Sequence, residues 1–574
     1  MPARLVDVLS FSCLALLALA GTAIANEDLT KTTTLRVLPA NTNAQQGGEY
    51  RLTYFSPDVP NARSLALSDR RPEWIVYVST RRSTRVYALI DADNDGVAES
   101  TVTVIADKST PNGIAYRGNS LFLAQVNRLW RYDNVDDAAL AGKPFGNPTL
   151  ISDAFPSDAS HGWKFIRFDP TRTWLYVPIG APCNICTMET VGSGPMTYGS
   201  INRIRYDGTG LEPVATGVRN TVGFDFHTHN DGELYFTDNG ADGLGDDVPD
   251  CTLNVVRVNE PTSPLPGKFG YPYCHGAGSG DPYVRDAGVI SPHSDPSMNP
   301  GGSTRSCGSP GEGGGAATLE QNGRIQALGP HTAPLGMRFY NRSFSEGGAH
   351  VLPKSDFPDD ANETTVLVAL HGSWNRSRKI GYSVHRVVLR STGEVKTHDV
   401  LIDGWLDRSS DSAWGRPVDV ELLPDGSVLI SDDGKNAVYR LAWHTTPPAT
   451  TTTTTPPATT TTTTTTPAAT TTATTTTPAT TTEATTTTTT TTTPAATTTT
   501  TTPATMTTTT TEATMTTTTT EVTTTTTTPA TTTTTTTEAT TTTTEVTTTT
   551  TLEATTTTTD GAVFVLAVLL VAAA

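Results

Sequence analysis

Positive charge is scarce in this 574-residue chain: 39 lysines and arginines stand against 57 aspartates and glutamates, giving a formal net charge of −18. An acidic protein repels phosphate backbones and anionic lipid surfaces, so we expect neither as a partner. Cysteine is scarce too, with six residues in all. Helical hydrophobic periodicity is nearly absent. No apolar run reaches the roughly 20 residues that a membrane-spanning helix needs. The composition therefore favours an all-β protein that does not cross a membrane with ordinary helices.

The first 25 residues predict a secretory signal peptide. Arg4 precedes the apolar run FSCLALLALAGTAIA, which ends in small residues. A basic start, a short apolar core and a small-residue cleavage site are typical of such signals. The alternative is a membrane anchor, for which the run is short. We expect residues 1–25 to be cleaved near Ala25 and the protein to be secreted.

The C-terminal part of the sequence has a composition that cannot form a packed core. Residues 445–559 are nearly all Thr, Pro and Ala with scattered Glu, which is typical of a disordered, O-glycosylated, mucin-like stalk. Residues 560–574 are mostly apolar, and as a helix they would rise about 21 Å, short of the roughly 30 Å of a bilayer core. This tail predicts a GPI-attachment signal, with a short membrane helix as the alternative. We expect a cell-surface protein held by a lipid anchor at Ala554 or Gly561.

Five cysteines follow the expected signal peptide, and in an oxidising compartment most of them should pair. The spacing in CNIC suits a disulfide between Cys183 and Cys186, whereas no βαβ pattern surrounds it to support a thioredoxin-like redox site. We expect a second pair, Cys274–Cys307, and an unpaired Cys251.

Six segments between residues 33 and 444 share one pattern: a strand, a polar turn, an aliphatic strand and a further strand. They are EWIVYVSTRRSTRVYALID from Glu73, NGIAYRGNSLFLAQVNRLWRYD from Asn112, KFIRFDPTRTWLYVPIGAP from Lys164, VGFDFHTHNDGELYFTDNG from Val222, TVLVALHGSWNRSRKIGYSVHRV from Thr365 and VDVELLPDGSVLISDDGKNAVYRL from Val418. Short strands with regular turn signals predict an all-β fold. Six repeats predict a six-bladed β-propeller, because radial closure leaves few exposed edges. The Gly-rich stretch 275–330 would be a loop inserted between blades.

Polar residues recur at matching points of these repeats. In a propeller, equivalent loops converge on one end of the central channel, so these residues should meet although they are distant in the sequence. The candidates are His161, Arg219, Asn220, Asn239, Gly240, His331, Thr332, Trp374, Asn375, Arg376 and Arg416. Cationic and amide groups gathered around one axis indicate a bound polyanion.

At these residues the chain resembles the soluble, quinone-dependent glucose/sorbosone dehydrogenases, which are six-bladed propellers that bind pyrroloquinoline quinone (PQQ) with calcium. Its sorbosone dehydrogenase and fungal pyranose dehydrogenase branches are the most similar. The matching stretches, in the family's order, are HGWKFIRFDP, GVRNTVGFDFH, FTDNGADGLGDD, FGYPYCHG, LGPHTAPLGMRFY, HGSWNRS and WGRPVDVELLPDGSVLISDD.

The resemblance implies a role for each matching position. His161 matches the general base that takes the proton of the substrate hydroxyl. Arg219 would stabilise negative charge that develops on the quinone oxygen. The implied cofactor-binding residues are Arg219, Asn220, Asn239, Thr332, Arg376 and Arg416. The backbone carbonyls of Gly240 and Ala241 would bind the calcium ion, which acts as a Lewis acid.

The chain departs from the family pattern at two places. Arg376 stands where the family often carries a lysine, and VPDCTLN replaces a more acidic stretch. Trp374, Asn375 and Tyr382 should lie near the site, which would shield Asn375 from glycosylation. Of the other two glycosylation sequons, at Asn341 and Asn362, we expect both on loops.

A separate acidic motif, DADNDGVAE, runs from Asp91 to Glu99. Carboxylates at Asp91, Asp93 and Asp95 alternate around a Gly turn, as in calcium-binding loops. No acidic residue stands at the twelfth position, so a full helix–loop–helix site is excluded. A structural calcium site and a plain acidic turn both fit the motif.

Together these features predict a secreted, surface-tethered quinoprotein oxidoreductase. It would oxidise a sugar or a related alcohol or aldehyde with PQQ and calcium, and pass electrons to an external acceptor. Two other classes of function remain open: a cofactor-free carbohydrate-binding or adhesion propeller, and a calcium-dependent lactonase-type hydrolase.

Overall fold

The fold is given by a computed structural model. It describes residues 27–38, 48–191, 197–258, 266–276, 293–303, 307, 323–345, 348–445, 552–559 and 562–569. The expected signal peptide, nearly all of the expected stalk and much of the Gly-rich stretch 275–330 lie outside these residues. The chain divides into two compact units, Met1–Pro456 and Pro457–Ala574, each described by itself below.

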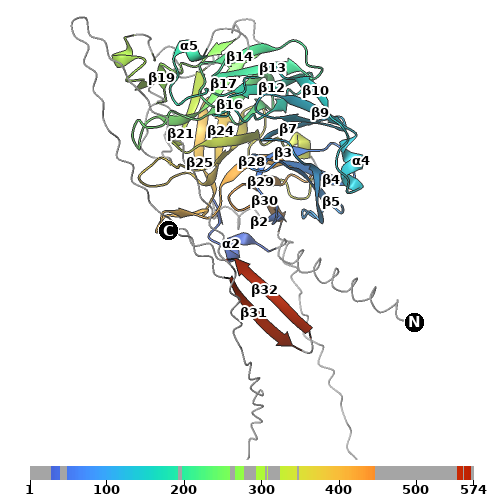
Figure 1. Ribbon diagram of the computed structural model, residues 1–574. Coiled ribbons are helices and arrows are strands. Elements are labelled where there is room, and N and C mark those ends of the chain that lie inside the picture. The colour runs from blue at the N-terminus through green and yellow to red at the C-terminus, as the bar shows by residue number, and fades with distance from the viewer. Residues whose placement is uncertain are drawn as a thin grey trace, which may run out of the picture. The chain divides into compact units, whose positions relative to one another are not determined.

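The first unit contains six antiparallel sheets that follow one another along the chain, as the six repeats predict (Figure 1). The first three are β3 (Ala62–Leu67), β4 (Trp74–Thr80), β5 (Val86–Asp91) and β6 (Ser100–Ile105); β7 (Gly113–Arg117), β8 (Ser120–Ala124), β9 (Leu129–Asp133) and β10 (Thr149–Ser152); and β11 (Arg167–Phe168), β12 (Trp174–Ile179), β13 (Ser200–Arg205) and β14 (Glu212–Thr216). The prediction of a six-bladed β-propeller is confirmed.

The next three blades repeat this order. They are β15 (Phe224–His227), β16 (Asn230–Asp238), β17 (Asp250–Arg257) and β21 (Gly323–Pro330); β22 (Pro334–Phe339), β23 (Glu363–Leu370), β24 (Ser383–Arg390) and β25 (Val395–Asp403); and β28 (Pro417–Leu422), β29 (Val428–Asp432), β30 (Ala437–Thr445) and β2 (Gly48–Ser56). In each blade the strand named first is the inner one, since these strands contact their counterparts in neighbouring blades.

The sixth blade joins the two ends of the domain. Its outer strand β2 pairs antiparallel with β30, with Tyr50 opposite Trp443 and Tyr54 opposite Tyr439. The rings of Tyr50 and Trp443 lie 4.9 Å apart in a T-shaped contact, and those of Tyr54 and Tyr439 stack at 5.3 Å. Pairing the first long strand with the last closes the ring and removes a free sheet edge.

Six hydrophobic clusters hold neighbouring blades together, one at each junction of the ring. At the closing junction, Phe55 and Val438 of the sixth blade pack in one cluster with Val78 of the first. Because every blade lies between two others, inner strands such as β22 and β28 are buried on both faces. These inner strands therefore do not show the alternation of buried and exposed residues that is typical of a sheet with one solvated face.

Short elements complete the first unit. They are α2 (Leu29–Thr32), α4 (Val135–Leu140), α5 (Met188–Val191), β1 (Arg36–Val37), β18 (Gly267–Lys268), β19 (Cys274–His275), β20 (His293–Ser294), β26 (Leu406–Asp407), β27 (Ser412–Ala413) and the 3₁₀ turns η1 (Pro300–Gly302) and η2 (Ser343–Ser345). The disulfides Cys183–Cys186 and Cys274–Cys307 are both present and Cys251 is free and buried, so the predicted pairing is confirmed.

In the second unit, β31 (Leu552–Thr559) and β32 (Ala562–Leu569) form an antiparallel hairpin that places Thr559 opposite Ala562. The expected boundary between an irregular stalk and an apolar tail thus falls inside a hairpin. β-Branched threonine and valine favour strands, which accounts for the pairing. Among the residues that the structure describes, no helix is long and apolar enough to cross a membrane.

Candidate active site

A cavity of about 480 Å³ lies at one end of the inner strands, lined by the first, fourth, fifth and sixth blades and by the connections before and after the third. Its lining includes Arg63, His161, Arg219, Gly240, His371 and Arg416. Its volume falls within the range of about 300–1,000 Å³ that is common for small-molecule sites. The fold therefore brings together residues as far apart in the sequence as Asn61 and Gly434.

The cavity is strongly basic although the chain as a whole is acidic. Five arginines and two aspartates line it, namely Arg63, Arg81, Arg82, Arg219, Arg416, Asp242 and Asp433. Burial and the neighbouring Arg63 and Arg82 lower the pKa of Arg81 to about 10, because they disfavour its positive charge. A bound anion would relieve this repulsion.

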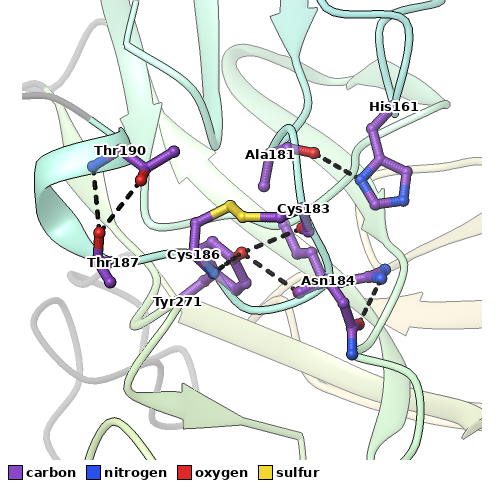
Figure 2. The surroundings of a disulfide bond; sticks show 9 residues. His161, Ala181, Cys183, Asn184, Cys186, Thr187, Thr190 and Tyr271 are labelled. Carbon is purple, nitrogen blue, oxygen red and sulfur yellow. Dashed lines mark hydrogen bonds between the residues drawn. A yellow bond between two sulfur atoms is a disulfide. The ribbon is translucent and has the colours of Figure 1, made fainter. Parts of the chain in front are cut away.

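His161 is fixed in a geometry that suits a proton acceptor. Its backbone is in the left-handed region (φ 48°), and its Nδ1 lies 2.7 Å from the carbonyl oxygen of Ala181 (Figure 2). Nδ1–H donation to this carbonyl leaves the lone pair on Nε2. Burial, and then the nearby Arg219, lower the pKa of His161 to about 4. The imidazole is therefore neutral at neutral pH.

Gly180 allows both His161 and Asn220 to pack closely against the end of β12. A Cβ at Gly180 would lie 2.5 Å from the Cβ of His161 and 3.0 Å from Oδ1 of Asn220. It would also lie 2.6 Å from the backbone oxygen of His161, so the segment that carries His161 would have to move. Glycine after β12 is thus required for these close approaches.

Figure 2 shows the loop that the Cys183–Cys186 disulfide closes and that carries Asn184. This loop holds Arg219. Arg219 Nε donates to the carbonyl of Asn184 at 2.9 Å, and Nη2 donates to its side-chain Oδ1 at 2.8 Å. The same Nη2 pairs with Asp242 at 2.8 Å. The Tyr271 hydroxyl, which accepts from the backbone N–H of Cys186 at 2.9 Å, anchors the loop. These contacts orient the guanidinium before any ligand arrives.

A second group of polar side chains lines the cavity beside Arg416. Arg416 donates to the carbonyls of His371 and Gly372 at 3.1 and 2.9 Å. Asp433 accepts from Arg63 at 2.9 Å and pairs with Nε2 of His371 at 2.7 Å. Burial lowers the pKa of His371 to about 4, so the ring is neutral and donates Nε2–H to Asp433.

The sequence-predicted residues divide into two sets. His161, Arg219, Asn220, Asn239, Gly240, His331, Trp374, Asn375 and Arg416 all line the cavity. Ala241 is fully buried behind it. Thr332 is also buried, and its hydroxyl donates to the carbonyls of Leu328 and Gly329 at 2.9 and 3.2 Å. Arg376 does not line the cavity and lies 3.3 Å from Asp247. The structure thus assembles most of the predicted set and turns Thr332 and Arg376 elsewhere.

One buried polar atom of the cavity lining, Oδ1 of Asn375, has no hydrogen-bond partner among the described residues. Asn375 is otherwise well held, since its Nδ2 donates to Asp242 at 2.6 Å and contacts His331 Nδ1 at 3.2 Å. Buried polar atoms normally have partners, so this amide oxygen indicates a missing hydrogen-bond donor. Together with the five lining arginines, which suit carboxylates, the residues present fit an anionic cofactor that can also donate a hydrogen bond.

Several lining residues were not predicted from the sequence: Arg63, Arg81, Arg82, Trp163, Asp242, His371 and Asp433. Arg81, whose guanidinium lies 3.5 Å from the centre of the Trp163 ring, follows the second strand of its blade. Asn239, His371 and Asp433 follow the second strands of theirs. Each of these residues directly follows the second strand of a repeat. In the first repeat this position falls in the segment STRRST, so the rule could have identified Arg81 and Arg82 from the sequence.

A second cavity, of about 420 Å³, opens at the other ends of the inner strands. It is lined by His227 and by charged side chains that pair with one another. Arg338 lies 2.9 Å from Glu421, and Arg167 lies 2.9 Å from Asp225. Because its charges are compensated internally, this end of the channel is a weaker candidate for an anion site.

A family model described as TrAA12-like matches residues 45–444, which is more than half of the chain. The chain belongs to the TrAA12-like family. Two solved structures have a similar fold. The PQQ domain of pyranose dehydrogenase from Coprinopsis cinerea is 17% identical, with a TM-score of 0.51 over 71% of this chain and 97% of that one. The Trichoderma reesei family AA12 protein is 19% identical, with a TM-score of 0.52 over 71% and 98%.

A protein from Borreliella burgdorferi, described as uncharacterized, is 29% identical to this chain over 346 residues, covering 59% of this chain and 77% of that protein. The two solved structures share the fold of this chain. Membership of the TrAA12-like family supports an enzyme of the oxidoreductase type.

Proposed function

We propose that this TrAA12-like propeller is a PQQ-dependent dehydrogenase that oxidises a sugar or a related alcohol or aldehyde, with calcium at the cofactor. The observation that carries the proposal is the excess of arginine over aspartate in the axial cavity of an acidic protein. PQQ is a tricarboxylate, and arginine forks pair with carboxylates bidentately. The similar Coprinopsis structure is titled a holo form of a PQQ domain, and a Trichoderma AA12 structure a calcium structure, which supports both cofactors.

Each residue has a role that follows from its geometry. Arg416, Arg63 and Arg81 attract and hold carboxylates. Arg219, which the disulfide loop orients, places positive charge beside the reacting edge. His161 accepts the substrate proton at Nε2, and its neutral form is present throughout the neutral range. When bound, the quinone accepts two electrons and the calcium ion acts as a Lewis acid. Gly240, which lines the cavity, is placed to offer a carbonyl oxygen to the ion.

The location of the enzyme is part of the proposal. A secreted protein explains the two disulfides, which persist in oxidising compartments. The Thr-rich composition of residues 445–559 supports a glycosylated stalk, and the apolar tail supports a lipid anchor. An extracellular sugar and an external electron acceptor would then both reach the cavity.

One experiment separates the proposed activity from the other two classes. The purified chain is loaded with PQQ and calcium, and reduction of a dye acceptor is followed with a panel of sugars. We expect sugar-dependent reduction that requires PQQ. Sugar binding without dye reduction would instead indicate a carbohydrate-binding propeller. Hydrolysis of a lactone without PQQ would indicate a hydrolase.

Trp374 offers a test of where the sugar binds. It lines the cavity yet is 73% exposed, which is unusual for a tryptophan. An exposed indole face at the mouth can pack against the apolar C–H face of a pyranose ring. We expect Trp374→Ala to raise KM for the sugar about tenfold, to change kcat little and to leave PQQ affinity unchanged. If the variant weakened sugar binding and PQQ binding by the same factor, Trp374 would be placed at the cofactor instead.

A further inference from the structure

The loop that joins β5 to β6 gathers four carboxylates far from the axial cavity. Asp91, Asp93, Asp95 and Glu99 each offer an oxygen, and these four oxygens lie within 4.8 Å of one another. Asp93, Asp95 and Glu99 are exposed, whereas Asp91 is completely buried. Like charges this close repel one another, so the arrangement is costly without a cation.

Asp91 supplies an independent indication of a ligand. Its Oδ2 accepts from the backbone N–H of Gly96 at 2.9 Å, but its Oδ1 is buried and has no hydrogen-bond partner. The side chain is 0% exposed, so this oxygen is not hydrated from bulk solvent. A metal ion would satisfy a buried carboxylate that has one oxygen without a donor and lies beside three other carboxylates.

We propose that Asp91, Asp93, Asp95 and Glu99 bind a calcium ion, separate from any ion at the cofactor. Oxygen-only ligands of this kind suit a hard cation, and the flexible geometry of a turn suits calcium better than magnesium. The sequence motif supplied the three aspartates. Glu99, eight residues after Asp91, completes the set and replaces the acid that the twelfth position lacks.

The position of this loop gives the ion a structural role. The N–H of Ala98 donates to the carbonyl of Phe55 on the closing strand β2 at 2.8 Å. Gly96 packs directly against Arg440 on β30, since a Cβ there would lie 2.2 Å from the guanidinium carbon. The loop of the first blade thus rests on the two strands that close the ring. Calcium would order this loop and strengthen the closure between the first and sixth blades.

The test compares Asp93→Asn/Asp95→Asn with the wild type in the absence of PQQ. Both residues are exposed, so the double variant should fold. Asp207→Asn is a matched control, because Asp207 is an exposed aspartate in the equivalent turn of the third blade, between β13 and β14. We expect the wild type and the control to bind one calcium ion more per chain than the double variant. We also expect calcium to raise Tm in the first two proteins and not in the double variant.

Terbium gives a second readout that does not depend on activity. Trp74 on β4 is directly opposite Asp91, so the two side chains share one face of the sheet. Terbium in the site should show emission sensitised by this indole. The double variant should lose this emission, and Trp74→Phe should reduce it.

The proposed site would be overturned if the double variant matched the wild type in calcium stoichiometry, in the Tm response to calcium and in terbium emission. Failure of dye reduction with an intact loop site would count only against the proposed dehydrogenase activity.

Discussion

Replacing His161 with alanine is expected to lower turnover by about 10²- to 10⁴-fold, the usual contribution of a general base, with PQQ affinity changed only a few-fold. The reason lies in the hydrogen bond from Nδ1 to Ala181, which reserves Nε2 for the substrate proton. His161 is neutral and is not one of the residues proposed to hold the PQQ carboxylates, so its removal should change PQQ affinity little. The measurement is dye reduction at saturating sugar, together with PQQ titration.

The pH dependence of His161 is a sharper signature than the loss of rate. Burial and Arg219 lower its pKa to about 4, so in the cofactor-free protein its imidazole should titrate near pH 4 rather than near 6.5. Only the neutral ring accepts a proton, so activity is lost as the pH falls through the pKa of the loaded enzyme. An adjacent bound anion favours the imidazolium and should raise this pKa. NMR titration of the histidine, with and without PQQ, measures the shift.

His227→Ala is the matched control for His161→Ala. His227 also has its pKa lowered to about 4, by burial, but it lines the other cavity. We expect this variant to keep its turnover. If His161→Ala kept normal turnover and His371→Ala lost most of it, the general base would instead be His371, which pairs with Asp433.

The propeller was predictable because its blades are repeats. Each repeat carries the same turn signals, and six of them leave radial closure as the economical arrangement. The closing strand β2 was not part of any recognised repeat. It precedes the first repeat in the sequence, but in the fold it pairs with β30 of the last blade. Burial on both faces was missed for a related reason: a single sequence does not show that each blade lies between two others.

The site was predictable as a set of loop positions and less so as a set of side-chain directions. Arg219 and Arg416 line the cavity as expected. Thr332, directly after His331, points to the carbonyls of its own turn because a short hydroxyl is satisfied locally. The backbone turns on both sides of Thr332, with φ 60° at His331 and 52° at Ala333, so a motif match does not carry over to both neighbours. The roles of these residues stay predictions until cofactor binding is measured.

The orientation of Arg219 could not be predicted, because it depends on a loop about 35 residues earlier. Asn184 holds the guanidinium through its backbone carbonyl and its side chain, and the CNIC disulfide closes the loop that carries Asn184. The disulfide and the arginine were each predicted from the sequence, without any link between them. Only the fold shows that the disulfide supports the arginine.

Arg219→Met is expected to weaken PQQ binding by about 30- to 5,000-fold, since removing one partner of a buried charged pair commonly costs about 2–5 kcal/mol. The loss has two sources. The variant removes a preoriented cation. It also leaves the Asp242 carboxylate, which in the wild type lies 2.8 Å from Nη2 of Arg219, without this partner beside the anionic cofactor. Turnover of the fraction that still binds should also fall by about 10²- to 10³-fold if Arg219 stabilises charge on the reacting oxygen. PQQ titration and turnover at saturating PQQ separate the two effects.

Arg36→Met is the control for the loss of one arginine. Arg36 pairs with Asp403 at 2.7 Å but its side chain is 63% exposed, so its removal should cost less than about 1 kcal/mol and leave PQQ binding unchanged. The double variant Arg219→Met/Asp242→Asn adds a second comparison, since it also removes the negative charge of the Asp242 carboxylate that loses its arginine partner. It should recover part of the lost affinity if repulsion from Asp242 contributes. Affinity in Arg219→Met equal to that of the control would show that the cavity does not bind the cofactor through Arg219, and would overturn the role proposed for this arginine.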